Sequence, residues 1–301
     1  MKKHFILVII LFVFCNGSIA QQTNKGFPKP PLLFLDQNPP FDEPQVFAKN
    51  IVSLDDKHEY CIAFSPDGRE IYFSRAGEGI MVSIYDGSEW TKPQKAAFGE
   101  QYKGGELHIT YDGKKLLMNR YAGLDSNETG GIWALQKTNN GWGKAQFLIP
   151  MGMRATSTYN GSIYTTDISG YRITGKDGGV ISYWIPTETG YQRGLDPDGG
   201  VNTDSIDSHP FIAPDESYLI FNSRRDGGYG ESDLYICYRL PNGKWSEAIN
   251  MTPLNSEYAD WCATVSPDRK YLFFTRNIKG KGDIFWVDAK IIEELKPKEL
   301  K

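Results

Sequence analysis

The chain has 301 residues, which leaves room for one large domain or two small ones. Hydrophobic residues make up 40% and charged residues 23%, so a packed core is expected and long disorder is not. The formal net charge of −4 argues against a nucleic-acid binder that works through a basic surface. Aromatic residues at 13% and 31 glycines favour many short strands joined by tight turns.

The first twenty residues have the pattern of a secretory signal peptide. Lys2 and Lys3 form a basic start, residues 5–14 are apolar, and Ser18 and Ala20 are the small residues expected before a cleavage site. The apolar run is too short to span a membrane, and no later segment is long and apolar enough to do so. We therefore expect a protein exported to the periplasm or beyond the cell, with no transmembrane segment.

The remaining chain divides into three parts. Residues 21–44 contain six prolines, so 21–43 is interpreted as an extended leader. Residues 44–295 are expected to form one domain, and residues 296–301 a charged tail.

A short pattern recurs through the predicted domain. The clearest copy is Phe64–Arg75, with the sequence FSPDGREIYFSR. It returns at residues 109–120, 212–223 and 265–276, with a weaker copy at 157–166. Each copy combines a strand, a turn of Pro-Asp-Gly type and an aromatic-rich strand, which is typical of a β-hairpin.

Two further strands are expected after each hairpin, and the fourth often begins at a tryptophan, as at Trp90, Trp142 and Trp245. Four antiparallel strands per repeat predict an all-β propeller, with five blades favoured and six as the alternative. The last repeat lacks a fourth strand, whereas residues 43–50 resemble one, so we expect the N-terminal strand to close the ring and remove the sheet edge there. The strands that face the central channel are predicted at residues 58–65, 105–110, 154–158, 207–213 and 259–265.

The repeats resemble a known family. Ser65–Gly68, Ser266–Asp268 and the stretch 227–235 (GGYGESDLY) resemble the TolB-type β-propeller repeats of secreted bacterial proteins, and the resemblance covers residues 44–290. It implies a propeller, and that family includes non-catalytic partners of envelope proteins. The chain is also similar, more distantly, to oligogalacturonate lyases, propellers that cleave acidic sugars by β-elimination with a metal held largely by histidines. No stretch matches their metal site residue by residue, so no metal ligands are predicted, and whether a divalent metal takes part is left open.

Chemistry-bearing residues gather at one predicted rim. The hairpin turns mark the other rim, so the starts of the first strands and the ends of the second strands lie opposite them. The histidines of the domain, His58, His108 and His209, all lie at or near first-strand starts. Arginines lie at or just after second-strand ends: Arg75, Arg120, Arg224 and Arg276. Five equivalent positions at the first-strand starts are Cys61, Glu106, Arg154, His209 and Cys262.

Guanidinium groups bind carboxylates and sulfates in bidentate fashion, so this rim predicts an acidic oligosaccharide as substrate. The predicted reaction is elimination across C4 and C5 of a uronate, by a lyase or a dehydratase. His209 is the first candidate for the base that removes the C5 proton, and His108 is the second. Tyr60 or His58 would protonate the leaving group, and Trp261 would stack on the sugar.

The sequence allows two roles for the arginines, in catalysis or in structural ion pairs. Arg75, Arg120 and Arg276 would stabilise the charge that develops on the substrate carboxylate, with Arg224 beside them. Alternatively, Arg75 pairs with Glu59, and Arg120 with Glu106, as structural ion pairs.

Two other questions stay open in the sequence. The protein is predicted to be a monomeric carbohydrate-active enzyme, and the alternative is a non-catalytic envelope propeller that binds a peptide or glycan. Cys61, Cys237 and Cys262 are interpreted as buried free thiols, with a Cys61–Cys262 disulfide as the alternative in an oxidising compartment.

Overall fold

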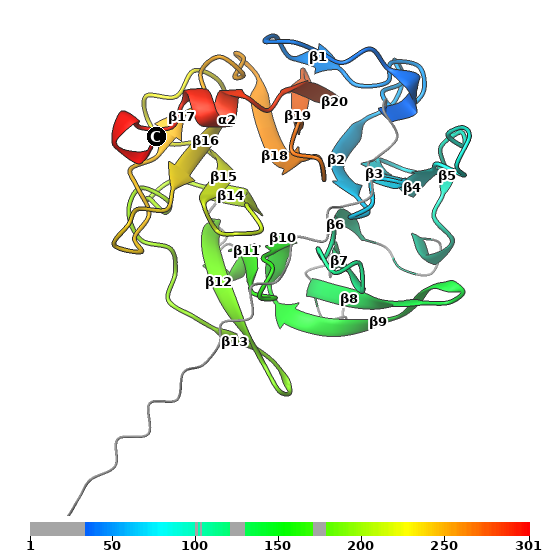
Figure 1. Cartoon of the computed structure of the whole chain (residues 1–301), viewed down its shortest axis with the longest axis horizontal. Helices are drawn as coiled ribbons and strands as arrows, with labels where there is room; N and C mark the ends of the chain where they lie inside the picture. Colours follow the sequence, from blue (N-terminus) through cyan, green and yellow to red (C-terminus); the bar gives the residue numbers. More distant parts are fainter. Residues whose placement is uncertain (1–33, 100–101, 103, 121–129, 171–178) are drawn as a thin grey trace, which may run out of the picture.

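The structure is a computed structural model that describes residues 34–99, 102, 104–120, 130–170 and 179–301. The predicted signal peptide at 1–20 lies outside the described residues. Within them, five four-stranded antiparallel sheets are arranged around a common axis (Figure 1). The predicted five-bladed β-propeller is therefore confirmed, and the six-bladed alternative is wrong.

Each of the first four blades is built from strands that follow one another in the chain. Blade 1 contains β2 (Glu59–Phe64), β3 (Glu70–Arg75), β4 (Gly79–Ile84) and β5 (Gln94–Lys95). Blade 2 contains β6 (Gly105–Ile109), β7 (Lys115–Arg120), β8 (Gly131–Thr138) and β9 (Gly141–Pro150). Blade 3 contains β10 (Gly152–Ser157), β11 (Ile163–Asp167), β12 (Val180–Thr187) and β13 (Gly190–Arg193). Blade 4 contains β14 (Asp207–Ile212), β15 (Tyr218–Ser223), β16 (Asp233–Tyr238) and β17 (Ile249–Asn250).

Blade 5 joins the two ends of the propeller. It contains β18 (Ala259–Val265), β19 (Tyr271–Ile278) and β20 (Lys281–Asp288), and its fourth strand is β1 (Gln45–Val46). Val46 lies opposite Phe285, and the next residue, Phe47, donates its backbone N–H to Ile284 O at 2.7 Å. The ring is thus closed by the N-terminal strand, as predicted, and the outer edge of β20 is paired.

The hairpin turns explain the repeated sequence. Ser65 Oγ lies 2.5 Å from Asp67 Oδ1, and Thr110 Oγ1 lies 2.7 Å from Asp112 Oδ1 in the next blade. Gly68 follows in the left-handed region at a φ of 69°, which costs glycine little. The recurring Ser/Thr-x-Asp pattern therefore encodes one local turn at the same rim of successive blades.

Apolar contacts between neighbouring blades form the core. At the seam between blades 1 and 5, Phe47 is fully buried with its ring 5.1 Å from that of Phe273 and 5.2 Å from that of Trp286. Phe34 covers this cluster with its ring 5.2 Å from that of Phe64. Phe34, the first described residue of the predicted leader, therefore packs on the propeller.

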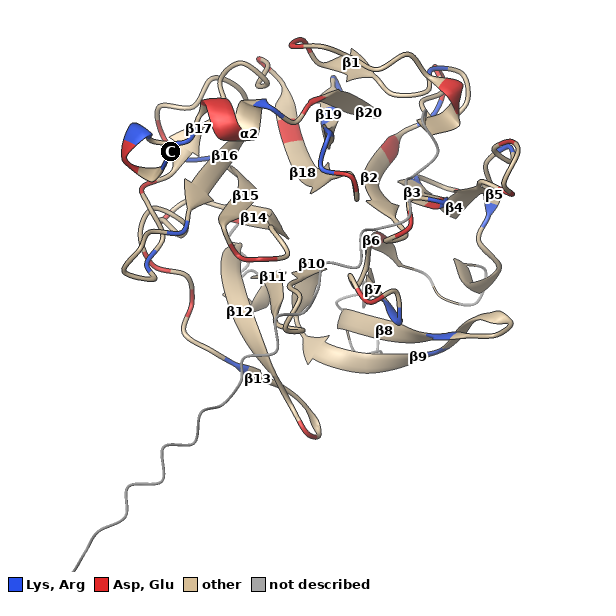
Figure 2. Ribbon diagram, in the orientation of Figure 1, with Lys and Arg blue, Asp and Glu red and all other residues tan. Residues whose placement is uncertain are grey.

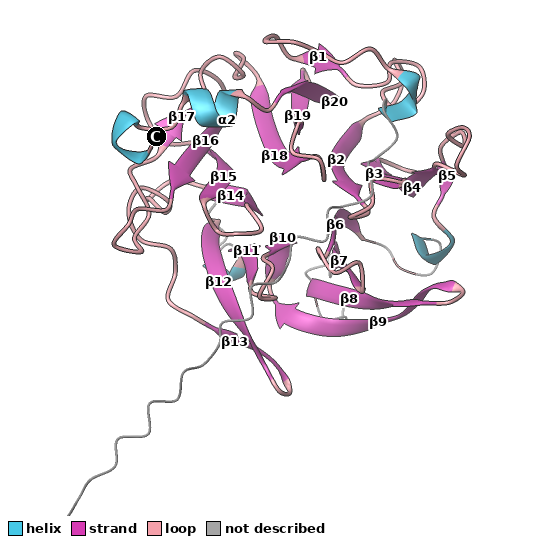
Figure 3. Ribbon diagram, viewed as in Figure 1, coloured by secondary structure: helices cyan, strands magenta, loops and turns pink. Residues whose placement is uncertain are grey.

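Helical segments are few and short (Figure 3). Those with bounds inside the described residues include η1 (Phe34–Asp36), η2 (Ala97–Gly99), α2 (Ile291–Glu294) and η3 (Lys298–Leu300). No helix in the described ranges has the length and apolar character needed to cross a membrane.

Candidate functional site

One residue in each innermost strand has a left-handed backbone. These residues, which we call the channel ring, are Cys61, Glu106, Arg154, His209 and Cys262, with φ between 47° and 57°. Each lies at an irregularity in the pairing of its strand with the next. Positive φ is uncommon outside glycine, so its recurrence in all five blades identifies a β-bulge built into the fold. The ring consists of the same five positions that the sequence repeats align.

Two members of the ring form a disulfide. Cys61 of blade 1 is bonded to Cys262 of blade 5, with their Cα atoms 5.5 Å apart. The bridge joins the innermost strands at the seam where the propeller closes. The prediction of free thiols is therefore wrong for these two residues, because the kink places their side chains within disulfide reach. Cys237 is a buried free thiol, as predicted.

Two others form a carboxylate–imidazole pair. Glu106 Oε1 lies 3.6 Å from His209 Nε2, with 12% of the His209 side chain exposed. The other ring nitrogen, Nδ1, lies 3.0 Å from Asn222 Oδ1 and 3.0 Å from Ser208 Oγ. Because an amide oxygen only accepts hydrogen bonds, this contact favours a proton on Nδ1 and an unprotonated Nε2 in the neutral imidazole.

A series of aromatic contacts continues from His209 around the channel mouth. The His209 and Trp261 rings are 4.9 Å apart, Trp261 stacks on Tyr60 at 5.8 Å, and Tyr60 meets His58 at 5.5 Å. All four side chains are partly exposed. Burial, and to a lesser degree the charge of Glu106, raise the pKa of Tyr60. The structure thus brings together four of the predicted site residues, and we call this set, with Glu106, the upper mouth.

His108, the second predicted base, lies elsewhere. Residue 108 lies beyond the bulge, toward the hairpin turns, where its side chain is buried. Its Nε2 accepts hydrogen bonds from Ser157 Oγ at 2.9 Å and from the Ser157 backbone N–H at 3.1 Å, which links blades 2 and 3. Burial, together with the charge of Arg154, lowers the pKa of His108 to about 3. The imidazole is therefore neutral and held between blades, remote from the upper mouth.

Two of the predicted arginines form buried ion pairs. Arg75 Nε lies 2.6 Å from Glu59 Oε1, and Arg276 Nε lies 2.7 Å from Asp260 Oδ1. Arg75 also donates to Val52 O at 3.0 Å. Burial raises the pKa of Glu59. These guanidinium groups hold the chain segment that enters each blade, and the Arg75–Glu59 pair is the structural alternative that the sequence offered.

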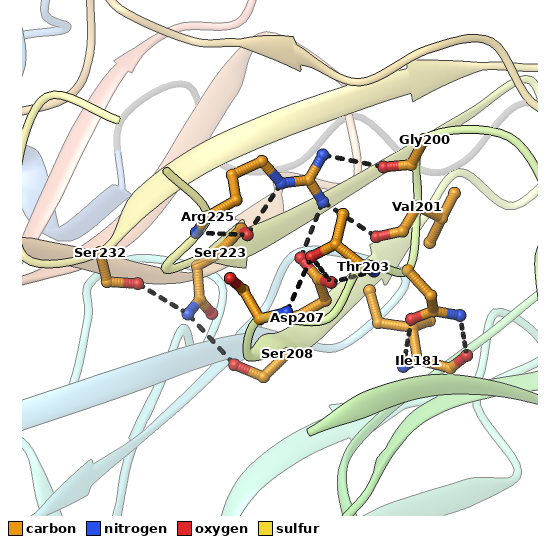
Figure 4. Close-up of polar contacts among 12 residues, drawn as sticks. Ile181, Gly200, Val201, Thr203, Asp207, Ser208, Ser223, Arg225 and Ser232 are labelled. Carbon is orange, nitrogen blue, oxygen red and sulfur yellow. Dashed lines mark hydrogen bonds and ion pairs between the residues drawn. The ribbon is translucent and has the colours of Figure 1, made fainter. Parts of the chain in front are cut away.

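Blade 4 has the same arrangement with an arginine that the sequence analysis did not single out (Figure 4). Arg225 donates to Asp207 Oδ1 at 2.7 Å and to the carbonyl oxygens of Gly200 and Val201 at 2.9 Å and 3.0 Å. The shift by two residues from the aligned position Ser223 conceals it in the repeat alignment. Arg224, the predicted residue beside it, is exposed.

The Arg120 guanidinium lies against aromatic rings. Its guanidinium carbon lies 4.5 Å from the centre of the Trp133 ring and 5.8 Å from that of Tyr102. Figure 2 shows Lys and Arg interspersed with Asp and Glu around the blades. In the part of the chain that the structure describes, no three His, Cys, Asp or Glu side chains are grouped to hold a metal ion.

No family model matches the chain, and no curated protein matches it. Several solved structures share its fold. A glycoside hydrolase has a TM-score of 0.56 at 9% identity, with 79% of this chain and 89% of that chain covered. A protein from a BT0996–RGII complex has a TM-score of 0.55 at 10% identity, with 82% of this chain and 90% of that protein covered. A GH43_12 protein from a capybara gut metagenome has a TM-score of 0.53 at 13% identity, with 84% and 54% covered.

At these identities the likeness shows the propeller fold alone. The chain also spans only 32% of a longer chain from a study of two prolyl endopeptidases, at a TM-score of 0.39.

Proposed function

We propose that the protein is an exported, monomeric, carbohydrate-active propeller that holds an acidic oligosaccharide at the upper mouth and cleaves it by elimination. The observation that carries the proposal is the contact series from Glu106 through His209 and Trp261 to Tyr60 and His58. It combines a titratable imidazole with a stacked aromatic pair at a partly exposed channel mouth. Glycoside hydrolases among the similar structures support a carbohydrate ligand.

His209 is the base in this proposal. With the proton on Nδ1 held by Asn222, the Nε2 lone pair takes the C5 proton of a uronate. The electrons of the C5–H bond form the C4–C5 double bond, and the C4–O bond breaks. Tyr60 or His58 donates a proton to the departing oxygen. Glu106, at 3.6 Å, stabilises the imidazolium that forms.

The substrate carboxylate needs a positive partner during this step. Arg75 and Arg276 already bind Glu59 and Asp260, so binding a second carboxylate there would require the buried pairs to open. We therefore assign carboxylate binding to Arg224, which is exposed. This narrows the predicted group of four arginines to one.

The test is incubation with uronate oligosaccharides while the ultraviolet absorbance of an unsaturated uronate is followed. General-base catalysis contributes about 10²–10⁴-fold, so His209→Ala is expected to lower kcat by roughly that factor. His108→Gln is the matched histidine control, since His108 lies away from the upper mouth, and its kcat is expected to stay near that of the parent. Equal activity of His209→Ala and the parent, with both folded, would overturn the assignment.

A non-catalytic propeller is the second candidate, and the ion pairs of Arg75 with Glu59 and of Arg276 with Asp260 favour it. If the arginines mainly stabilise the fold, the upper mouth retains aromatic stacking but little charge to stabilise an elimination transition state. Calorimetric titration with the same oligosaccharides separates the two functions. Binding that is lost in Trp261→Ala, without formation of any unsaturated product by the parent, identifies a glycan-binding protein.

A further inference from the structure

A second candidate site lies at the end of the propeller opposite the upper mouth. There, a cavity of about 60 Å³ lies between the innermost strands and the hairpin turns. Its apolar walls come from four blades and include Ile62, Ile109, Phe211 and Val265. Neither Glu106 nor His209 lines it, so the channel ring separates this lower cavity from the upper mouth.

Arg154 lines the lower cavity, and it donates hydrogen bonds to uncharged acceptors. It is 1% exposed, and it donates to Leu107 O at 2.9 Å, Ala263 O at 3.1 Å and Thr264 Oγ1. These partners belong to blades 2 and 5, so the side chain crosses the channel, and all three acceptors are uncharged. Its Nε is also buried and has no hydrogen-bond partner among the described residues.

A guanidinium in this position favours an anionic oxygen. Removing a cation from water costs several kcal/mol unless an opposite charge or strong acceptors compensate it. Burial lowers the pKa of Arg154, and the negative charge of Glu106 opposes this shift. Glu106 Oε1 also lies 3.6 Å from His209 Nε2. A ligand carboxylate entering the lower cavity from the hairpin side would approach the Arg154 guanidinium and add a negative charge beside it.

The opening of the lower cavity has aromatic and basic groups. Tyr111 and Tyr159 meet edge to face at 5.4 Å, and Arg269 Nη2 donates to Tyr159 Oη at 3.1 Å. Tyr218 also lines the cavity. Arg269 is exposed and would attract an anion toward the opening, and the tyrosine rings and apolar walls would contact an apolar stem.

We propose that the lower cavity is a second binding site, which takes a carboxylate carried on an apolar or aromatic stem, with the carboxylate directed at the Arg154 guanidinium. The upper mouth is not involved in this proposal. The required chemistry is shared by small arylalkyl acids and by a peptide ending in an aromatic residue.

Calorimetric titration of the full chain with four probes tests the proposal. They are 3-phenylpropanoate, 3-phenylpropanamide, the tripeptide Ala-Ala-Phe and its C-terminal amide. At least one carboxylate is expected to bind about tenfold or more tightly than its own amide, because a charge-assisted hydrogen bond to a buried group is lost in the amide. Whichever carboxylate binds more tightly identifies the source of the ligand.

A matched pair of surface variants locates the binding. Ser217 lines the lower cavity, and its N–H and Oγ contact Asp215 Oδ1 at 3.1 Å and 2.6 Å. Ser88 makes the same contacts with Asp86 Oδ1 at 2.7 Å and 2.8 Å, away from the cavity. Ser217→Trp should obstruct the cavity and abolish binding, whereas Ser88→Trp should bind like the parent.

Three results would overturn the proposal: no binding of either carboxylate, equal binding of a carboxylate and its amide, or unchanged binding by Ser217→Trp. Arg154→Gln gives a direct check where it folds, with carboxylate affinity expected to fall to that of the amide. Since none of these variants alters His209, Trp261 or Tyr60, the outcome is independent of uronate cleavage at the upper mouth.

Discussion

The disulfide between Cys61 and Cys262 should contribute a large part of the stability of the propeller. The bridge closes a loop with a sequence separation of 201 residues at the seam between blades 1 and 5. A cross-link of this span restricts the unfolded chain strongly, and the chain-entropy relation gives about 5 kcal/mol for it. Replacing both residues, in Cys61→Ser/Cys262→Ser, is expected to lower the free energy of unfolding by about 3–5 kcal/mol.

Urea unfolding followed by tryptophan fluorescence measures this loss. Reduced parent protein is the informative control, because it keeps both sulfur atoms in the core and loses only the cross-link. If the effect lies in the unfolded chain, the reduced parent and the double variant should lose similar stability, and both should show a larger m-value because more surface is exposed on unfolding. Cys237→Ser, which removes an uncrosslinked buried thiol, controls for the substitution itself. A loss below about 1 kcal/mol in the double variant would refute the reasoning.

Three further predictions test how the blades are held together. Burial lowers the pKa of His108 to about 3 in the folded protein, so the unfolded chain binds one more proton than the folded chain between pH 6.5 and 3. The free energy of unfolding should therefore fall by up to about 1.4 kcal/mol per pH unit as the pH drops through this range. Urea titrations at several pH values measure this slope, which His108→Gln should reduce. Arg75→Ala leaves the buried Glu59 carboxylate without its ion-pair partner and should lower the free energy of unfolding by about 3–5 kcal/mol in the same urea assay. Arg224→Ala, at an exposed residue, should lower it by less than about 0.5 kcal/mol. Equal losses in the two variants would contradict a stabilising role of the Arg75–Glu59 ion pair. Phe47→Ala should destabilise the closing strand by about 3–5 kcal/mol in thermal and urea unfolding, and a neutral result would mean that β1 does not hold the ring shut.

The sequence predicted the blades well because the turn chemistry is local. Each hairpin is fixed by a few residues, such as Ser65 and Asp67, whose contacts lie within the turn itself. Once the period is visible, the strand order follows, and the missing fourth strand of the last blade identifies β1 as its replacement. The predicted register at the rim, with residue 61 opposite residue 75, is wrong by two residues, since Glu59 lies opposite Arg75 and Cys61 lies at the bulge.

The site was harder to predict, because side-chain direction within a blade depends on the bulge. A regular strand alternates its faces, so the extra residue at Glu106 changes which later residues face the upper mouth. His108, which we predicted near the start of its strand, is instead the second-last residue of β6 and lies on the hairpin side. Arg225 was missed for a related reason, because it reaches Asp207 from two residues beyond the aligned position. Pairwise geometry across blades, as in the Cys61–Cys262 bridge, is not contained in any single repeat.

The channel ring shows how one backbone feature supports different chemistry in each blade. The bulge fixes where the residue lies, and neighbouring blades satisfy its backbone: Thr275 Oγ1 accepts from the Cys61 N–H at 3.0 Å, and Thr166 Oγ1 accepts from the His209 N–H at 2.8 Å. The side chain is then free to vary, and the five positions contain a disulfide, a carboxylate, a guanidinium and an imidazole. Arg154, for example, crosses the channel and donates hydrogen bonds to backbone carbonyls of blades 2 and 5. Because the threonine contacts are made by the backbone N–H groups of Cys61 and His209, they do not depend on which side chain stands at the position.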